Sequence, residues 1–199
     1  MKEYYDTRAP EYDEWYRGLG RFDGLERPHW DDELRELEGV IASLPPRRTL
    51  DVACGTGFLT QHLRGEVIGF DQSARMLEIA RERLPDARLV QGDALDLPFP
   101  DAEFDRVFTA HFYGHLHPPE RAAFLAEARR VGAELVVVDA ARRPDREPDE
   151  MQQRVLNDGA TFEVFKRYFT GAQLADELGG GEVLYDGRWF VVVASVGES

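Results

Sequence analysis

The stretch RTLDVACGTGFLTQHL, from Arg48 to Leu63, decides the fold. A short apolar run breaks into Cys-Gly-Thr-Gly and then resumes as a predicted helix over residues 58–63. Because Gly55 and Gly57 carry no side chains, a ligand can lie against the main chain there, and the predicted helix would present free N–H groups to it. The alternative is a tight strand-to-helix turn that needs glycine for its backbone geometry alone.

Segments with strand and helix patterns alternate along the first two thirds of the chain. This alternation predicts a parallel sheet covered by helices on both faces. Ser73 is the predicted N-cap of one helix. The predicted strands are residues 49–53, 66–71, 87–93, 104–111 and 133–140, and the predicted helices are 31–44, 58–63, 73–84 and 119–131.

The last third departs from that pattern. Residues 141–150 read as a charged, proline-bearing loop, and residues 171–180 as a short helix with a glycine stop. Residues 182–196 read as two strands joined at Asp186-Gly187, a strong hairpin signal. A parallel sheet that finishes with a hairpin gains an antiparallel strand at one edge, so the prediction is an α/β, doubly wound, mostly parallel sheet.

Composition limits the functional classes. The chain has 199 residues and a net charge of −14, which argues against a nucleic-acid substrate, since phosphate binding needs a basic face. The sequence shows no apolar run long enough to span a bilayer and no secretory signal, and its single cysteine, Cys54, cannot form an internal disulfide. The expected location is therefore cytoplasmic. The pattern indicates no particular oligomeric state.

Acidic residues close the second and third predicted strands. Asp71 lies 20 residues after Asp51, where a carboxylate can accept both hydroxyls of a ribose. Asp93 closes the next strand, where it can accept from the exocyclic amine of an adenine. One such acid is commonly only a turn or cap residue, but glycines and acids together at three strand ends indicate a groove shaped for a nucleoside.

The turn distinguishes between two nucleoside cofactors. The dinucleotide fingerprint G-x-G-x-x-G places its third glycine at position 60, which is Thr60 here. Asp51 at the start of the turn repels phosphates and suits an amino group. A nucleoside that bears a cationic amino acid, S-adenosylmethionine, fits this turn better than a dinucleotide.

With these motifs the chain resembles the class I S-adenosylmethionine-dependent methyltransferases, in particular the small-molecule branch with the ubiquinone and menaquinone methyltransferases. LDVACGTG resembles motif I, GFDQSARMLEIAR the segment around motif II, and GDALDLPFPDAEFDRV motifs III and IV. YYDTRAPEYDEWY is similar to the aromatic entry segment of that branch. The resemblance covers residues 4 to about 140 and implies a Rossmann-like, seven-stranded sheet. One departure is Ala53, where many members have glycine.

The resemblance also implies the cofactor contacts. The methionine moiety would contact Asp51, Ala53 and Gly55, with Gly57 in the same turn. Asp71 would hold the ribose, and Gln72, Met76, Asp93 and Ala94 would surround the adenine. Thr109, Ala110 and His111 would line the floor beneath the sulfonium, and Tyr12 would close over the cofactor.

Three histidines, His111, His115 and His117, follow the fourth predicted strand. A base is needed only where the acceptor loses a proton on attack, and His111 and His115 are the candidates, because histidine titrates near neutrality. The alternative is that transfer runs on proximity and His115 only packs or caps. Without a companion Cys or carboxylate cluster, the three histidines do not indicate a metal.

Two other segments point to an acceptor side. The aromatic residues of segment 1–30 could form a lid, an interpretation that the resemblance favours for Tyr4 and Tyr12, whereas Trp15 reads as packing. Segment 142–170 reads as an acceptor-side insertion in a single domain spanning residues 1–199. Its Lys166 and Arg167 would either bind an anionic acceptor or balance surface acids.

The predicted function is transfer of a methyl group from S-adenosylmethionine to a small-molecule acceptor by in-line displacement. A cofactor-binding regulatory or partner protein would need the same residues and remains open. A nicotinamide-dependent oxidoreductase is disfavoured by Thr60.

Overall fold

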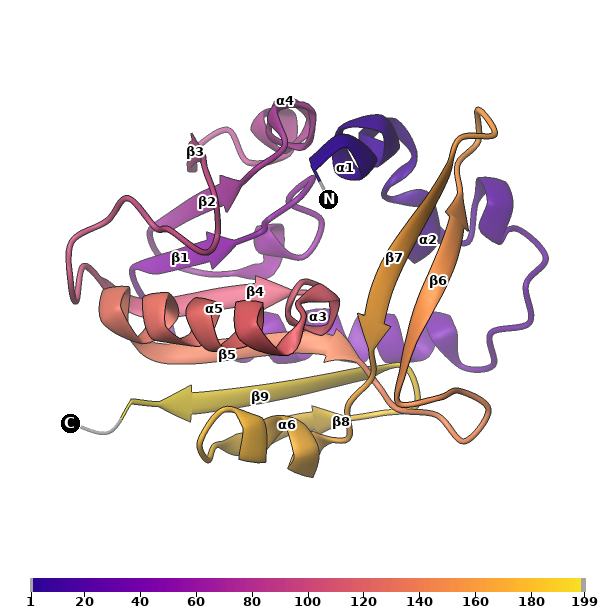
Figure 1. Ribbon diagram of the computed structural model, residues 1–199. Helices are drawn as coiled ribbons and strands as arrows, with labels where there is room; N and C mark the ends of the chain where they lie inside the picture. Colours follow the sequence, from indigo (N-terminus) through magenta and orange to yellow (C-terminus); the bar gives the residue numbers. More distant parts are fainter. Residues whose placement is uncertain (1, 198–199) are drawn as a thin grey trace.

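The computed structural model describes residues 2–197 and is built on a seven-stranded sheet with strand order β3-β2-β1-β4-β5-β9-β8 (Figure 1). The first five strands along the chain are parallel, and β9 runs antiparallel to both β5 and β8. This confirms the predicted fold class. The strands are β1 (Thr49–Val52), β2 (Val67–Asp71), β3 (Arg88–Gln91), β4 (Phe104–Ala110), β5 (Gly132–Ala140), β8 (Glu182–Asp186) and β9 (Phe190–Val196).

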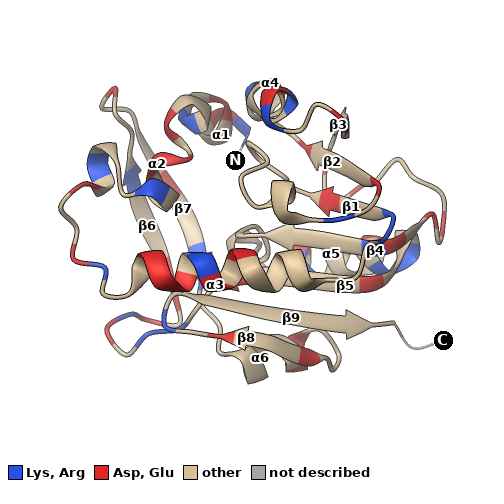
Figure 2. Ribbon diagram, turned by 180° about the vertical axis from the view of Figure 1, so that it is seen from behind, with Lys and Arg blue, Asp and Glu red and all other residues tan. Residues whose placement is uncertain are grey.

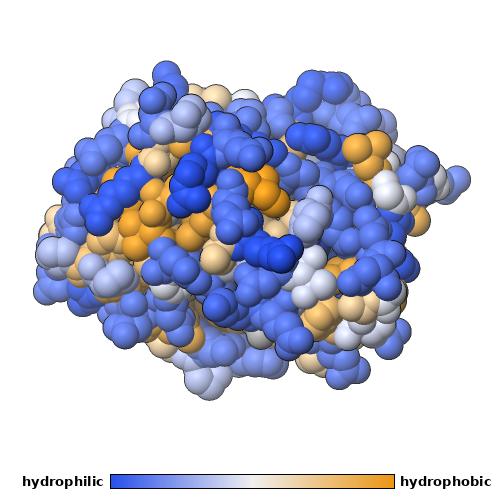
Figure 3. Space-filling model, turned by 90° about the horizontal axis from the view of Figure 1, so that it is seen from above, coloured by the Kyte–Doolittle hydropathy of each residue, from blue (hydrophilic) through white to orange (hydrophobic). Residues whose placement is uncertain are grey.

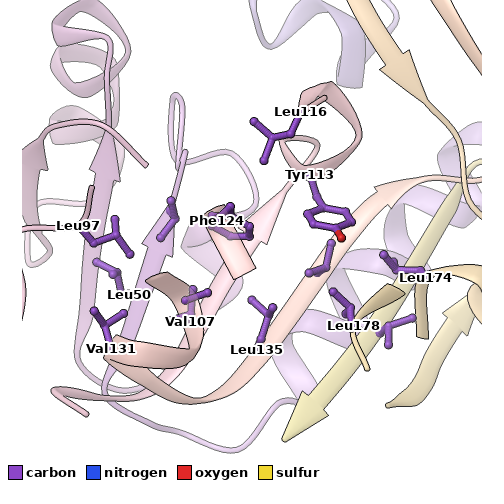
Figure 4. Close-up of a cluster of buried hydrophobic side chains, with 14 of the residues drawn as sticks. Leu50, Leu97, Val107, Tyr113, Leu116, Phe124, Val131, Leu135, Leu174 and Leu178 are labelled. Atoms are coloured by element: carbon purple, nitrogen blue, oxygen red, sulfur yellow. The ribbon is translucent and has the colours of Figure 1, made fainter. Parts of the chain in front are cut away.

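Helices cover both faces of the sheet. Helices α5 (Pro118–Val131) and α6 (Gly171–Glu177) lie over one face, and α3 (Trp30–Ser43) lies over the other (Figure 1). Successive residues of a strand point to opposite faces, so Val107 joins the core beneath α5 and α6 (Figure 4) and Phe108 joins the core beneath α3. Acidic residues mark the outer side of α3 (Figure 2).

Helix α4 (Ala74–Arg83) follows β2 as predicted. The Ser73 hydroxyl accepts from the Met76 main-chain N–H, which confirms the predicted N-cap. Met76, Leu77 and Ala80 are buried beneath the helix. The cap fixes the start of α4 directly beside the carboxyl end of β2, where the predicted ribose acid lies.

The predicted helix over residues 58–63 is wrong. Only a 3-10 turn, η3 (Thr60–His62), follows the glycine turn. Beyond this turn Gly65, with φ +102°, brings the chain against Arg47, whose carbonyl oxygen would lie 2.4 Å from a Cβ at this position. No α-helix therefore begins at the glycine turn within the described chain, and the predicted helix dipole is replaced by a single 3-10 turn.

Segment 142–170 contains a β-hairpin that the sequence analysis did not predict. Its strands β6 (Asp149–Val155) and β7 (Thr161–Arg167) form a separate two-stranded antiparallel sheet, which stands beside the carboxyl end of β5 (Figure 1). β6 reads DEMQQRV and has almost no apolar residues, so no period-two apolar pattern marks it.

The N-terminal segment packs between this hairpin and α4. It consists of α1 (Lys2–Arg8), η1 (Ala9–Glu11), α2 (Glu14–Arg17) and η2 (Gly20–Phe22). Tyr4 packs on Phe162 of the hairpin, with ring centroids 5.3 Å apart. The Ser73 hydroxyl donates to Asp6 at 2.5 Å, which ties α1 to the start of α4. Within residues 2–197, none of the helices has both the length and the apolar character that a bilayer crossing demands.

Candidate active site

A cavity of about 190 Å³ lies at the carboxyl ends of β1, β2, β3 and β4, where the strand order reverses. This is the ligand position expected of a doubly wound sheet. We call it the first cavity. Most of the predicted cofactor residues line it, namely Tyr12, Ala53, Gly55, Asp71, Gln72, Met76, Asp93, Ala94, Ala110 and His111.

Asp71 organises the wall of the first cavity. Its Oδ2 accepts from the Gly55 N–H at 2.9 Å, and its Oδ1 accepts from the Ser73 N–H at 2.8 Å. Burial raises the pKa of this carboxyl, although both hydrogen bonds act in the opposite direction. Each carboxylate oxygen keeps a further lone pair, so Asp71 can hold the turn and still accept from a ribose hydroxyl.

Asp51 is 2% exposed and does not line the first cavity. It lines a small hollow of about 10 Å³ that shares Tyr12, Ala53 and Ala110 with the wall of the first cavity. The Thr60 hydroxyl donates to its Oδ2 at 2.6 Å, which explains why position 60 carries threonine here. Its Oδ1 has no hydrogen-bond partner among the described residues. Burial raises the pKa of Asp51 to about 8. A buried carboxylate oxygen without a donor is costly, and the ammonium group of S-adenosylmethionine would satisfy it.

The charge of the first cavity also fits this cofactor. Three acids, Asp71, Asp93 and Glu120, line it, and no Lys or Arg does so within residues 2–197. A sulfonium and an ammonium are attracted to such a wall, whereas a pyrophosphate is repelled. The residues present therefore fit S-adenosylmethionine and do not fit a dinucleotide.

Two predicted cofactor residues face away from the first cavity. Gly57 has φ +75°, and a Cβ there would meet Leu84 Cδ1 at 2.7 Å, so this glycine serves turn geometry and packing on α4. The Thr109 hydroxyl donates to the Val52 carbonyl at 2.7 Å, across two central strands. Ala53 keeps its place in the wall with φ +60°, a conformation that explains why glycine suits this position.

The sequence analysis missed several lining residues. Three of them lie next to predicted residues in the sequence: Gly92 precedes Asp93, Leu95 follows Ala94, and Phe112 follows His111. Glu120 carried no signal in the sequence, since its other role is to accept from the His117 N–H at the start of α5. The missed residues are Phe70, Gly92, Leu95, Phe112, Leu116 and Glu120, whereas Tyr5 belongs to the aromatic segment already proposed as a lid. Seen from above, near α1 and α4, apolar side chains gather within a rim of hydrophilic ones (Figure 3).

A second cavity, of about 460 Å³, lies between the N-terminal segment, the β6–β7 hairpin and the end of β5. Tyr5, Tyr12, His111 and His115 line both cavities. We call these four residues the neck. They mark the place where a group bound in one cavity can reach a group bound in the other.

His115 is held in one orientation. Its Nδ1 lies 2.7 Å from the Phe165 carbonyl oxygen of β7. Since a carbonyl only accepts, Nδ1 carries the proton and Nε2 is left as the basic nitrogen. Burial, then the positive charge of Lys166, lowers the pKa of His115 well below its ordinary value.

His111 is also neutral but is oriented differently. Its backbone has φ +55°, and its main-chain N–H donates to the Val138 carbonyl at 2.8 Å. Burial lowers its pKa to about 4, and its buried Nε2 has no partner within the described chain. His117 lines neither cavity and stacks on Phe165, with centroids 4.5 Å apart. Residues 2–197 contain no group of three or more His, Cys, Asp or Glu side chains placed to hold a metal ion.

The structure separates the two basic residues of segment 142–170. Lys166 lines the second cavity and pairs with the buried Asp139 at 2.5 Å. Arg167 lies outside both cavities and pairs with Glu177 of α6, also at 2.5 Å. Arg167 therefore balances an acidic side chain, as one of the two alternatives predicted. Of the two residues, only Lys166 lies where a ligand in the second cavity could contact it.

The aromatic residues of the N-terminal segment divide in the same way. Tyr4 is buried against the hairpin and lines neither cavity, so the lid interpretation does not extend to it. Tyr5 and Tyr12 lie at the neck, and a Cβ on Gly55 would lie 3.6 Å from the Tyr12 ring. Trp15 packs on Trp30 at 4.8 Å, as expected, and also lines the second cavity.

Three comparisons with known proteins agree with this geometry. Residues 49–134 match the model of a methyltransferase domain. A demethylmenaquinone methyltransferase of Thermotoga maritima is 38% identical over 107 residues, which are 51% of this chain and 44% of that protein. Another, of Deinococcus radiodurans, is 34% identical over 151 residues, covering 70% of this chain and 59% of that protein. The chain thus spans about half the length of these curated relatives.

The similarity to solved structures extends over nearly the whole chain. The structure of DhpI with S-adenosylhomocysteine has a TM-score of 0.73 and 28% identity, covering 96% of this chain and 92% of that one. In fold, and in sequence over residues 49–134, the chain therefore resembles the class I S-adenosylmethionine-dependent methyltransferases. Within that class it resembles the demethylmenaquinone methyltransferases in sequence.

Proposed function

We propose that the protein transfers a methyl group from S-adenosylmethionine to a small-molecule acceptor. The observation that carries this proposal is the neck, where an acid-lined cavity fitted to the cofactor meets a larger second cavity. The cofactor supplies a methyl group that its sulfonium already activates for in-line displacement. The work of the chain is to align the two reactants and to exclude water.

The residues of the first cavity would take separate parts of that work. Asp51 Oδ1 would accept from the ammonium of the methionine moiety, and Asp71 from the ribose hydroxyls. Tyr12, over Gly55, would close the cavity from the side of the N-terminal segment. We infer that this segment acts as a lid and that the β6–β7 hairpin forms the acceptor side of the domain.

A base at the neck is available where the acceptor loses a proton. His115 Nε2 is the lone pair that the Phe165 contact leaves free, so it would accept that proton as the new bond to carbon forms. His111 Nε2 has no hydrogen-bond partner among the described residues, and the ring packs edge-on against Trp15 with centroids 5.0 Å apart. Of the two histidines proposed from the sequence, the geometry favours His115.

Two measurements test the proposed function. Calorimetry with S-adenosylhomocysteine and with NADH should show binding of the former and none of the latter; the reverse result would contradict the assignment. Turnover of methyl-labelled S-adenosylmethionine with a library of small acceptors then separates an enzyme from a cofactor-binding regulator. Cofactor binding without turnover on any acceptor would favour the regulator.

A further inference from the structure

The second cavity is strongly basic in a chain that is strongly acidic. Seven Lys or Arg side chains line it against two acids, Glu26 and Asp145, while the whole chain has a net charge of −14. The basic residues are Arg8, Arg27, Arg143, Arg146, Arg154, Lys166 and Arg188. An excess of five positive charges around one concave site focuses the local potential on anions.

Several of these cations have no carboxylate partner within residues 2–197. Arg143 and Arg146 pair with Asp145 and Glu150, and Lys166 with Asp139. No ion pair within 4.0 Å is found in the described chain for Arg8, Arg27, Arg154 or Arg188. Four of the seven positive charges are therefore not compensated by an ion pair within the described chain.

Within the described chain, Arg154 differs from the other basic residues of the second cavity in having a buried nitrogen without a hydrogen-bond partner. Its Nε is buried and has no hydrogen-bond partner among the described residues. A buried donor without an acceptor costs free energy, and an oxyanion in the cavity would satisfy it. Arg also binds carboxylate and phosphoryl groups with two parallel hydrogen bonds, which adds geometric selectivity.

The hairpin places Arg154 and Lys166 on one face. Gln152 and Arg154 are two apart on β6, and Lys166 and Tyr168 are two apart at the end of β7, so each pair points to the same side. All four line the second cavity. The positive charges of both Arg154 and Lys166 also act on His115 at the neck. An anion bound by these two side chains would lie next to the proposed site of transfer.

We propose that the second cavity binds an acceptor that carries a carboxylate or phosphoryl group, and that Arg154 and Lys166 hold this oxyanion. The inference rests on the proposed function only in calling the ligand an acceptor. The rest of the acceptor lies against the aromatic wall. All three tryptophans of the chain, Trp15, Trp30 and Trp189, line this cavity, so intrinsic fluorescence reports on its occupation.

The test is a tryptophan-fluorescence titration in phosphate-free buffer, with and without S-adenosylhomocysteine. The probes are benzoate, phenyl phosphate and the neutral benzamide. At least one anion should bind about 10-fold or more tightly than benzamide and weaken as salt is added. The stronger of benzoate and phenyl phosphate identifies the oxyanion. Equal affinity for all three probes would overturn the proposal, whatever the variants show.

Two matched variants locate the effect. Arg154→Met removes the charge and keeps the stem, and should weaken anion binding by about 10- to 100-fold, with benzamide unchanged. Arg81→Met makes the same change on the exposed side of α4 and should have no effect. Equal losses in the two folded variants, or no loss in Arg154→Met, would contradict the role of Arg154.

A failure of the proposed anion site can be distinguished from a failure of the proposed methyl transfer. If anions bind and S-adenosylhomocysteine does not, the function fails and the anion site stands. If S-adenosylhomocysteine binds and only neutral acceptors are methylated, the function stands and the anionic acceptor is refuted.

Discussion

The two cavities carry opposite charge on either side of the same four neck residues. Three acids and no Lys or Arg line the first cavity within the described chain, whereas seven basic residues and two acids line the second. The negative charge of the first cavity suits a cationic cofactor, and the positive charge of the second cavity suits an anionic acceptor. The comparison teaches that the net charge of −14 does not predict the charge of an individual site, because the second cavity is basic.

The neck itself is neutral. Burial lowers the pKa of both His111 and His115, so both rings are uncharged near pH 7. A neutral base between an acidic and a basic cavity can accept a proton without first losing one. The predictions below test each side of this boundary.

The largest effect is expected at the neck. His115→Ala should lower turnover by about 10²–10⁴-fold if the acceptor loses a proton on attack. The affinity for S-adenosylhomocysteine should change little. Because the pKa of His115 is well below 6.5, wild-type turnover should not fall between pH 8 and pH 6.5 for lack of this base. Steady-state kinetics with labelled cofactor measure the turnover of the variant and the pH dependence of the wild type.

The control is His117→Ala, since His117 lines neither cavity. Its turnover should stay close to wild type. If His115→Ala also retains its turnover, transfer depends on proximity alone and the base is not needed.

The next effect is expected in the first cavity. Asp71→Asn should weaken S-adenosylhomocysteine binding by about 2–4 kcal/mol, because it weakens hydrogen bonds to the ribose and to the Gly55 N–H. Isothermal titration calorimetry gives the affinity, and circular dichroism checks the fold. Asp86→Asn, at an exposed site beyond α4, makes the matched change and should bind as wild type does. Unaltered affinity in folded Asp71→Asn would show that its carboxylate does not contact the cofactor.

A smaller, pH-dependent effect is expected at Asp51. Its pKa is raised to about 8 in the free protein, so most of the carboxyl is protonated at pH 7. A cofactor ammonium favours the ionised form, so binding should release a proton, and affinity should rise by up to about tenfold per pH unit toward pH 8. Calorimetry at pH 7 in buffers of different ionisation enthalpy counts that proton.

The same carboxyl has a consequence for stability. Its folded pKa lies above its ordinary value of 3.8, so its contribution to the stability of the free protein should decrease as pH rises from about 4 to about 8. Asp51→Asn should remove the proton release and flatten this pH dependence. A proton count of zero in the wild type would place the ammonium elsewhere.

The sequence predicted the sheet well because its signals were local. Buried strands such as β5 read as apolar runs, and the Ser73 cap and the Asp186-Gly187 turn mark their elements directly. The hairpin was missed because β6 is polar on both faces and pairs only with β7. The predicted charged loop over residues 141–150 is confirmed up to residue 148, and the strand that follows it, β6, places Gln152 and Arg154 in the wall of the second cavity.

Site residues could be predicted from the sequence where they lie at the ends of strands. They could not be predicted where contacts between distant segments determine the direction of a side chain. Asp71 and Gly55 follow from their position after a strand, and both line the first cavity. Thr109 shares such a position, but its hydroxyl bonds to Val52 instead. Nothing in the sequence places the Phe165 carbonyl, 50 residues away, on the ring of His115. The neck is therefore visible only in the folded chain.

A crystal structure of the protein with S-adenosylhomocysteine tests the central claim most directly. The account predicts that the ammonium lies within hydrogen-bond distance of Asp51 Oδ1, that the ribose contacts Asp71, and that the sulfur faces the neck between Tyr5, Tyr12, His111 and His115. A ligand bound in the first cavity with its sulfur turned away from the second cavity would contradict it, because no acceptor there could then receive the methyl group.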